Sequence, residues 1–431
     1  MPDVVIIGGG PAGSTLASYL SMAGIDNIII EGANHPRPHV GESMVTSTTR
    51  VFEEIGFLET MEREGFVKKY GASWHAPQRK GVFTIEFGEF PQPGIDQDYT
   101  YHVDRSKLDL LLLKHAESLG TKIYQGQYVQ EVLMKDGKAV GVRINSFGEP
   151  VDIKAKIVVD ASGRHTLLGK QLGLKRPDPD FNQFAVHAWF ENVDKSIGKR
   201  DDDIHIYFLT CERGWVWQIP ITDEITSIGV VAEKEVFKQS KQDVESYFNT
   251  HIATNPNLKN AMENAVRVND FKKEADYSYS MEKFVGDGFL CVGDAARFVD
   301  PIFSSGVSVA LASAKYASEQ IVKAMEKGDF SEAAFKPYET KLRSGVSVWY
   351  EFIRLYYKLL PSFTHFIQSK KHRLEVLQLL QGEVFDRQDV PVLDAMRKFI
   401  KDVEQNDKHI LRNALTDLEL PDVAAAQEIS T

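Results

Sequence analysis

The sequence predicts an α/β protein built on a doubly wound parallel sheet, with an inserted antiparallel sheet and a C-terminal helical region. The first observation behind this prediction is "DVVII" at residues 3–7, a short apolar run typical of a strand buried on both faces. A glycine-rich turn, a helical pattern that stops at Gly24 and a second apolar run, "NIIIE", follow it. Together they predict a βαβ unit with parallel strands and a right-handed connection.

The second observation is a change of pattern along the chain. "KLDLLLLKHAESLG" (107–120) predicts an amphipathic helix that ends at glycine, and "AKIVVDASG" (155–163) predicts another buried strand. From about residue 181 to residue 271, alternating segments such as "QFAVHAWFENV", "DIHIYFL" and "TSIGVVA" are typical of antiparallel strands. We therefore expect one module over 1–330, with the antiparallel sheet inserted at about 181–271, and a helical region over 331–431.

Composition and charge narrow the possible functions. The chain has 431 residues and a formal net charge of -11 without a basic stripe, so nucleic acid is not an expected partner. Cys211 and Cys291 are far apart and in no paired motif, and we expect neither a disulfide framework nor a metal site. The N-terminal "MPDVVIIGGG" has no basic n-region, and its apolar run is too short to span a bilayer. We expect a cytoplasmic protein without a membrane partner.

A glycine motif follows the first strand. Gly8, Gly10 and Gly13 form a G-x-G-x-x-G pattern between the predicted strand and helix, and Glu31 ends the second strand. Glycines there let backbone N–H groups and the helix N-terminus approach a pyrophosphate, and the carboxylate can bind a ribose hydroxyl. In this strand–loop–helix context the pattern predicts a dinucleotide site.

A second motif, "LCVGDAA", places Gly293 and Asp294 after another buried strand. An aspartate before a helix is commonly a cap, but with the glycine loop it resembles the FAD-binding signature of the flavoprotein monooxygenase superfamily. The resemblance covers about residues 3–325 and implies that Asp294 holds the ribityl chain. It implies further FAD contacts at Ala12, Arg37, Ser43, Arg105 and Asp160. For each arginine alone, a surface ion pair is an equal interpretation.

The sequence departs from the aromatic hydroxylases of that superfamily. Their DG motif falls at Asp160, but here the glycine is delayed to Gly163, and the chain has no second G-x-G-x-x-G pattern. A site for NAD(P)H is therefore not evident. We expect a separate NAD(P)H-dependent flavin reductase to supply reduced FAD.

Two further stretches are similar to motifs of flavin-dependent halogenases. "WVWQIP", with Trp215 and Trp217, matches their W-x-W-x-I-P motif, and "FVDPIFSSG" matches their F-x-x-P-x-x-S-x-G motif. Lys69 falls where that family keeps an essential lysine, and Lys68 is the neighbouring alternative. A strand face packed into a core remains the other interpretation of the tryptophan pair. Over nearly its full length the chain most resembles halogenases that act on a pyrrole held on a carrier protein.

The resemblance implies a mechanism and roles for these residues. Reduced FAD and O2 form a flavin hydroperoxide, which oxidises chloride or bromide to hypohalous acid. Trp215 and Trp217 separate the flavin from the substrate, and Lys69 relays the oxidant, either as a haloamine or as a hydrogen-bonding ammonium. Backbone amides at Ser305 and Gly306, before a predicted helix, are the expected halide site, although "SSGV" is also a plain turn. The expected substrate pocket includes Phe303 and Trp349; Phe303 stands where tryptophan halogenases carry a glutamate.

The sequence thus predicts an FADH2-dependent halogenase that acts on a pyrrolyl group tethered to a peptidyl carrier protein, with chloride preferred. The basic cluster "QSKKHRLE" (368–375) is a candidate docking site for that carrier, or simply a solvated surface. The alternatives are halogenation of a free or carrier-bound phenol, an FAD-dependent aromatic hydroxylase, and a non-catalytic flavoprotein.

Overall fold

A computed structural model describes residues 1–76, 81–90, 97–146, 148–209, 213–275, 278–385, 387 and 389–420. The chain divides into two compact units, each assembled from separate segments. The first unit contains Met1–Gly65, Val103–Asp178 and Ser278–Ser344, and the second contains Phe66–His102, Pro179–Tyr277 and the chain from Gly345 onward. This division differs from the expected modules 1–330 and 331–431, because residues 66–102 join the inserted segment.

The first unit is built on a six-stranded sheet with the order β20-β21-β11-β1-β2-β7. These strands are β1 (Val4–Ile7), β2 (Asn27–Glu31), β7 (Lys122–Gln125), β11 (Ile157–Asp160), β20 (Val285–Gly286) and β21 (Phe289–Cys291). All neighbours pair in parallel except the edge strand β20. β1 is buried along its whole length, which confirms the predicted parallel sheet and its continuous apolar strand.

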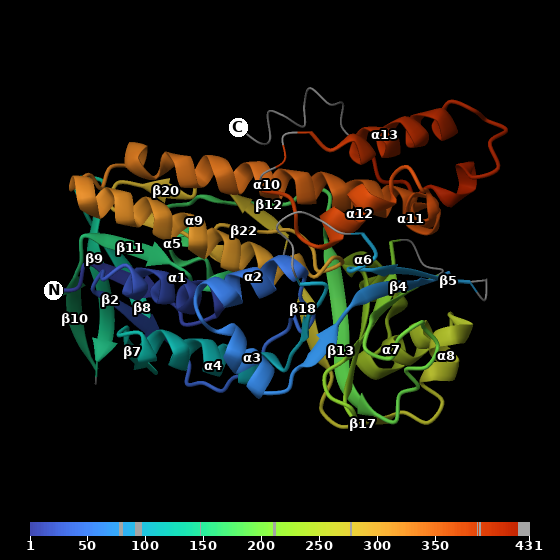
Figure 1. Ribbon diagram of the computed structural model, residues 1–431, viewed down its shortest axis with the longest axis horizontal. Helices are drawn as coiled ribbons and strands as arrows, with labels where there is room; N and C mark the ends of the chain where they lie inside the picture. Colours follow the sequence, from blue (N-terminus) through green and yellow to red (C-terminus); the bar gives the residue numbers. More distant parts are fainter. Residues whose placement is uncertain are drawn as a thin grey trace. The chain divides into compact units, whose positions relative to one another are not determined.

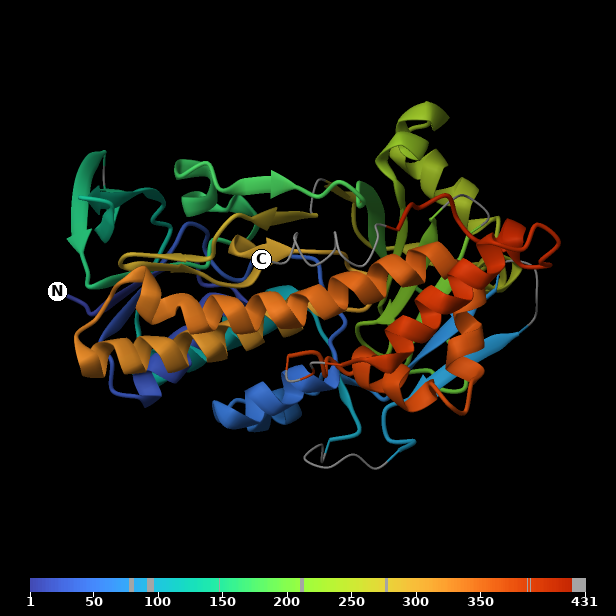
Figure 2. The same ribbon diagram turned by 90° about the horizontal axis from the view of Figure 1, so that it is seen from above.

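Helices and two smaller sheets complete the first unit. The helices are α1 (Pro11–Met22), α2 (Thr46–Glu54), α3 (Leu58–Arg63), α4 (Arg105–Ser118), α5 (Leu167–Gln171), α9 (Ser305–Lys327) and the 3-10 turns η1 (Gly163–His165) and η2 (Gly293–Ala295). α1 packs against both α4 and α9 (Figure 1). A sheet of β8 (Val129–Lys135), β9 (Lys138–Ser146) and β10 (Glu149–Lys154) lies at the same end as the N-terminus (Figure 2). The third sheet contains β12 (Lys175–Pro177), β19 (Tyr279–Met281) and β22 (Arg297–Phe298).

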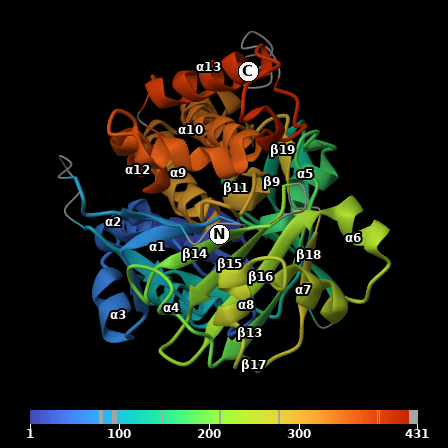
Figure 3. The ribbon, with the colours of Figure 1, turned by 90° about the vertical axis from the view of Figure 1, so that its right-hand side faces the viewer.

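The second unit contains the sheet predicted over 181–271, with two additional strands. Its order is β17-β13-β16-β15-β14-β4-β5, with β18 paired to β13. The strands are β4 (Gly71–His75), β5 (Val82–Glu86), β13 (Gln183–Glu191), β14 (Ile204–Phe208), β15 (Trp215–Pro220), β16 (Thr226–Glu233), β17 (Val266–Arg267) and β18 (Lys272–Ala275); Figure 3 shows β13 to β16 together. The described pairings between strands within 181–271 are antiparallel, as predicted. β4, which precedes this range in the chain, joins the sheet by pairing with β14 in parallel.

Short helices and a second sheet surround this sheet within the second unit. They are α6 (Lys234–Ser240), α7 (Val244–Ile252), α8 (Pro256–Ala261) and the paired strands β3 (Val67–Lys69) and β6 (Thr100–His102). Tyr247, Phe248 and Leu258 pack from α7 and α8 onto the apolar side chains of β13 and β16. This core holds the sheet against its helices by burying aromatic surface.

The C-terminal region is helical, as predicted. α10 (Glu332–Leu359), η3 (Leu360–Phe363), α11 (Thr364–Gln368), α12 (Arg373–Leu380), α13 (Pro391–Glu404) and η4 (Arg412–Ala414) follow one another. α10 contributes to both units, since the division falls after Ser344. Among the described residues, none of the helices has the length and apolarity needed to cross a membrane.

Candidate active site

The glycine loop between β1 and α1 has a geometry that requires glycine at two positions. Gly8 has a φ of +104°, and a Cβ there would lie 2.5 Å from the Ala161 carbonyl oxygen. A Cβ on Gly13 would lie 2.0 Å from the carbonyl oxygen of Gly8. Pro11 takes the first position of α1 without losing a hydrogen bond. The loop thus brings its backbone and the N-terminus of α1 together, as a pyrophosphate site requires.

Glu31 is buried beside this loop at the end of β2. Its Oε2 accepts a hydrogen bond of 2.6 Å from the Gly9 N–H, and its Oε1 accepts one of 2.7 Å from the Ala33 N–H. The carboxylate is therefore fixed at the edge of the glycine loop. That is the position from which an acidic residue binds the ribose of a dinucleotide.

Two predicted FAD contacts, Arg37 and Arg105, share one buried carboxylate. Arg105 donates from Nε to Asp109 Oδ1 at 2.8 Å and from Nη2 to Oδ2 at 3.1 Å, and Arg37 Nη2 lies 3.9 Å from Oδ2. Burial raises the pKa of Asp109, but the charge and hydrogen bonds of Arg105, with smaller contributions from other cations, lower it overall. A Cβ on Gly10 would lie 3.5 Å from Arg37 Nη2, so Arg37 lies beside the glycine loop.

Replacing Asp109 by asparagine is expected to lower the free energy of unfolding by about 3–5 kcal/mol, because it leaves the buried Arg105 guanidinium without its counter-ion. FAD affinity is expected to fall as well, since Arg37 loses its anchor. Thermal unfolding and a titration with FAD measure the two effects. Glu117→Gln, an equal charge change at an exposed position of α4, is the matched control. Unchanged stability in Asp109→Asn would contradict the role given to this carboxylate.

The second predicted motif lies close to α1 in the first unit. Gly293 has a φ of +58°, and its Cβ would meet the Cβ of Ala12 at 2.9 Å. Burial raises the pKa of Asp294 to about 6, against the opposing charges of Arg164 and Arg105. Asp294 is thus a half-buried carboxyl that the charge of Arg105 reaches, with chemistry that suits a sugar-like hydroxyl.

Asp160 and Ser43 have other surroundings. Asp160 is fully buried, and its two oxygens accept hydrogen bonds from the backbone N–H groups of Ser162 (2.9 Å) and Leu168 (2.8 Å). These bonds fix the turn after β11, and an FAD contact of Asp160 stays a prediction. Ser43 is buried two residues after Gly41, whose carbonyl oxygen accepts a 3.4 Å hydrogen bond from Arg105 Nη1.

The loop before α9 has the form expected of an anion site. Ser304 has a φ of +58°, and α9 begins at Ser305 and runs for 23 residues. The Ser305 hydroxyl donates to the Asp300 carbonyl oxygen at 3.2 Å, which fixes the turn. The first N–H groups of a helix have no acceptor within it and lie at the positive end of its dipole. Ser305 and Gly306 therefore remain the predicted halide contacts, and Phe303 is buried just before them.

The tryptophan pair lies on β15, and its two indoles are neighbours on one face, as residues two apart on a strand are. Their ring centroids are 5.9 Å apart with planes at 50°. Trp215 Nε1 donates to the Tyr357 hydroxyl at 2.8 Å, and Trp217 Nε1 donates to Ser227 Oγ at 3.1 Å. A Cβ on Gly229 of β16 would lie 2.1 Å from the Trp217 ring. Both rings are thus held rigidly; their action as a barrier remains a prediction.

Lys69 is buried at the end of β3. Only 3% of its surface is exposed, and its Nζ lies 5.5 Å from the centre of the Phe87 ring. Burial lowers the pKa of Lys69 to about 7, against the opposing charge of Asp203. By contrast Lys68 is half-buried and lies over the Tyr99 ring at 4.2 Å. A fraction of Lys69 is therefore available as a neutral amine near neutral pH.

Two further candidates have defined surroundings in the second unit. Trp349 is buried in α10, and its Nε1 has no hydrogen-bond partner among the described residues. Arg373, in the basic cluster 368–375, pairs with Glu89 at 2.6 Å and donates to the carbonyl oxygens of Ile367 and Thr84 at 2.7 Å and 2.8 Å. The charge of Arg373 is therefore already paired within the fold, while a carrier-docking role for the cluster stays a prediction.

Sequence reasoning did not identify three buried polar residues: Asp109, His102 and Asp203. Asp109 had a local signal, because it lies four residues after Arg105 on one helix face. His102 and Asp203 had none, since strand pairing between distant segments brings them near Lys69. Cys291 is buried and unpaired; Cys211 lies outside the described residues.

Comparison with known proteins first defines the class. Residues 1–347 match the family model described as FAD binding domain, which agrees with the glycine loop, Glu31 and the arginine pair. The chain is thus an FAD-dependent enzyme, and the predicted cofactor is confirmed.

Relatives define the family more closely. The 1H-pyrrole-2-carbonyl peptidyl-carrier protein chlorinase of Pseudomonas fluorescens is 48% identical over 97% of this chain and 97% of its own length. The corresponding brominase of Pseudoalteromonas luteoviolacea is 32% identical over 89% of this chain and 92% of its own length. The solved structure of the flavin-dependent brominase Bmp2 has a TM-score of 0.85 at 30% identity, covering 94% of this chain and 99% of that one. The chain belongs to the flavin-dependent halogenases.

Proposed function

We propose that this halogenase acts on a pyrrolyl group tethered to a peptidyl carrier protein, with reduced FAD supplied by a separate NAD(P)H-dependent reductase. The observation that carries the proposal is Lys69, buried at the end of β3 with a pKa of about 7. A buried amine that is partly neutral near pH 7 suits the transfer of an oxidised halogen far better than a solvated ammonium. The substrate class rests on the two relatives whose names state it.

The residues of the first unit bind cofactor and halide in this proposal. The glycine loop, Glu31 and Asp294 hold the pyrophosphate and sugar portions of FAD, while Arg37 and Arg105 add positive charge beside them. When bound in its reduced form, FAD supplies the electrons for O2 to oxidise a halide to hypohalous acid. The amides at Ser305 and Gly306 bind the halide before that reaction.

The residues of the second unit control where the oxidant reacts. Trp215 and Trp217 are fixed by hydrogen bonds and present a rigid apolar wall that excludes water. Lys69 accepts the halogen and transfers it to the ring. Phe303 of the first unit offers no carboxylate, which suits an electron-rich pyrrole that needs no additional base.

Intact mass spectrometry of a pyrrolyl-loaded carrier protein tests this proposal. The carrier is incubated with the protein, FAD, a flavin reductase, NADH, O2, and chloride or bromide in turn. A halogen isotope pattern that requires Lys69 and is largest with chloride is the expected result. Addition of oxygen alone would identify a hydroxylase, and halogenation of free phenols but not of the carrier would reject the substrate.

A further inference from the structure

Asp203 lies beside Lys69 through strand pairing. Ile204 of β14 pairs in parallel with Ala72 of β4, so Asp203, just before β14, falls next to Gly71. A Cβ on Gly71 would lie 3.1 Å from Asp203 Oδ1. Residues two apart in extended chain share a face, so the carboxyl occupies the side of the chain on which Lys69 projects. A Cβ at position 71 would lie closer still, 2.2 Å, to the Ile85 carbonyl oxygen, so glycine here makes room for the neighbouring strand as well as for the carboxyl.

Asp203 is a buried acid whose carboxyl group makes no hydrogen bond to the described residues. Its exposed fraction is 0%. Burial raises its pKa to about 7, with Asp202 acting in the same direction and Lys69 opposing. An unpartnered buried carboxyl is costly, which indicates a function rather than a structural role.

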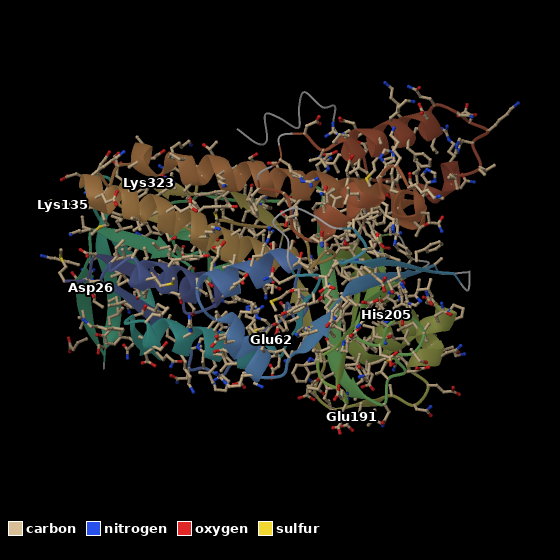
Figure 4. The ribbon with its side chains drawn as sticks, in the orientation of Figure 1. Asp26, Glu62, Lys135, Glu191, His205 and Lys323 are labelled. Atoms are coloured by element: carbon tan, nitrogen blue, oxygen red, sulfur yellow. The ribbon has the colours of Figure 1, made fainter. Side chains whose placement is uncertain are left out.

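His102 is a further buried titratable residue near Lys69. Its Nε2 lies 3.1 Å from the Asp202 carbonyl oxygen and donates to it, so Nδ1 carries no proton. Burial and the nearby charge of Lys69 lower the pKa of His102 well below its usual value, so it adds no charge. Figure 4 shows His205, the other histidine that affects His102, on β14 within the second unit. Among the described residues, Asp202, Arg200 and Glu86 are the other charged groups that affect the pKa of Asp203.

We propose that Lys69 and Asp203 share one proton, and that Asp203 is the acid and base for halogen transfer to the Lys69 amine. This inference rests on the proposed function. It adds a role for Asp203 and specifies the protonation state in which Lys69 reacts. It selects the neutral amine, and hence the haloamine, over a hydrogen-bonding ammonium. The shared proton sits on the carboxyl when the amine reacts.

The step balances without another reagent. The Lys69 nitrogen attacks the halogen of hypohalous acid, so an N–X bond forms, the O–X bond breaks, and the departing hydroxide takes the Asp203 proton to become water. The carboxylate then removes a proton from the halogenated nitrogen. The net change is amine plus hypohalous acid to haloamine plus water. Transfer to an aromatic C–H position exchanges halogen for hydrogen and restores the amine.

The proton sharing is tested on FAD-loaded protein without any halogenation. Cyanate, as the small neutral acid HNCO, carbamylates amines, and peptide mass spectrometry gives the rate at Lys69 between pH 5.5 and 10. Wild type is expected to show a midpoint near pH 7. In Asp203→Asn the midpoint moves lower by on the order of one unit, because the charge that stabilises the ammonium is gone. Asp203→Glu keeps the wild-type midpoint more closely, and Asp201→Asn, an exposed neighbour, leaves it unchanged.

Turnover separates a proton-transfer role from a purely electrostatic one. The halogenation rate of Asp203→Asn is expected to fall about 10²-fold, although its Lys69 amine reacts more readily with cyanate. Asp203→Glu is expected to regain part of the halogenation rate. The inference would be overturned by a wild-type midpoint above pH 9 or by an unchanged midpoint in Asp203→Asn. It would also be overturned if Asp203→Asn halogenated faster than wild type, in step with its faster carbamylation. A wild type that carbamylates as expected but halogenates no carrier would reject the proposed substrate and leave the shared proton established.

Discussion

Lys69→Met is expected to reduce halogenation of the substrate by at least about 10³-fold, because it removes the nucleophile that carries the halogen. Halide oxidation is expected to continue, since the glycine loop, Glu31 and the arginine pair do not include this lysine. Free hypohalous acid then escapes and converts added free methionine to its sulfoxide. The measurement is therefore a pair: halogenated substrate by intact mass, and methionine sulfoxide from the same reaction.

Lys68→Met is the matched control, because Lys68 is adjacent, half-buried and placed over Tyr99. It is expected to retain activity within a few-fold of wild type. Loss of sulfoxide together with loss of product in Lys69→Met would mean that Lys69 acts before hypohalous acid forms, and would contradict the relay. Loss of activity in both variants would point to a general effect of charge on this sheet.

Unfolding cannot explain the expected loss in Lys69→Met. The folded-state pKa of Lys69 is about 7, against 10.5 for an ordinary lysine. Between these values the unfolded chain binds more protons than the folded chain, so the wild-type protein loses stability as pH falls from 10.5 to 7. Methionine does not titrate, so the variant is expected to be more stable than wild type. The difference in thermal unfolding should be largest at and below pH 7 and should shrink toward pH 10.

The elements that the sequence predicted well are those with a local signature. "VVII" and "NIIIE" are continuous apolar runs, and both are strands of the parallel sheet. The strands of the inserted sheet alternate, and β13, β15 and β16 pair as expected. "GASWH" lacked such a pattern because it mixes small and polar residues. Its parallel pairing with β14, from a segment about 130 positions later, is a property of the tertiary fold.

The same distinction holds for the site. Gly8, Gly13 and Glu31 interact within one βαβ unit, so their spacing alone places them together. Asp203 lies near Lys69 only because β4 and β14 are neighbours, and nothing in "DDDIHI" distinguishes its third aspartate from the first two. Asp160 shows the reverse case: its place in a motif suggests an FAD contact, while each of its oxygens already accepts a hydrogen bond from the backbone of its own turn, so the FAD contact stays a prediction.

The second large effect concerns the glycine loop. Two alanine substitutions there are expected to differ in whether they reduce folding stability as well as FAD binding. Gly13→Ala places a Cβ 2.0 Å from the Gly8 carbonyl oxygen, and backbone must move to relieve the overlap. It is expected to lower the free energy of unfolding by about 1–3 kcal/mol and to abolish measurable FAD binding. Thermal unfolding of the FAD-free protein and quenching of FAD fluorescence measure these effects.

Gly10→Ala separates cofactor approach from folding. Its Cβ has only an ordinary contact, 3.5 Å from Arg37 Nη2, so the FAD-free protein should unfold at the wild-type temperature. The methyl group nevertheless stands where the pyrophosphate approaches the backbone, and FAD is expected to bind about 10²-fold more weakly, or ~2.8 kcal/mol. If Gly10→Ala instead destabilised the FAD-free protein and bound FAD normally, this glycine would serve the turn rather than the cofactor. Because the clash at Gly13 is with backbone and the contact at Gly10 is with a flexible side chain, the two variants together distinguish the fold of the loop from its function.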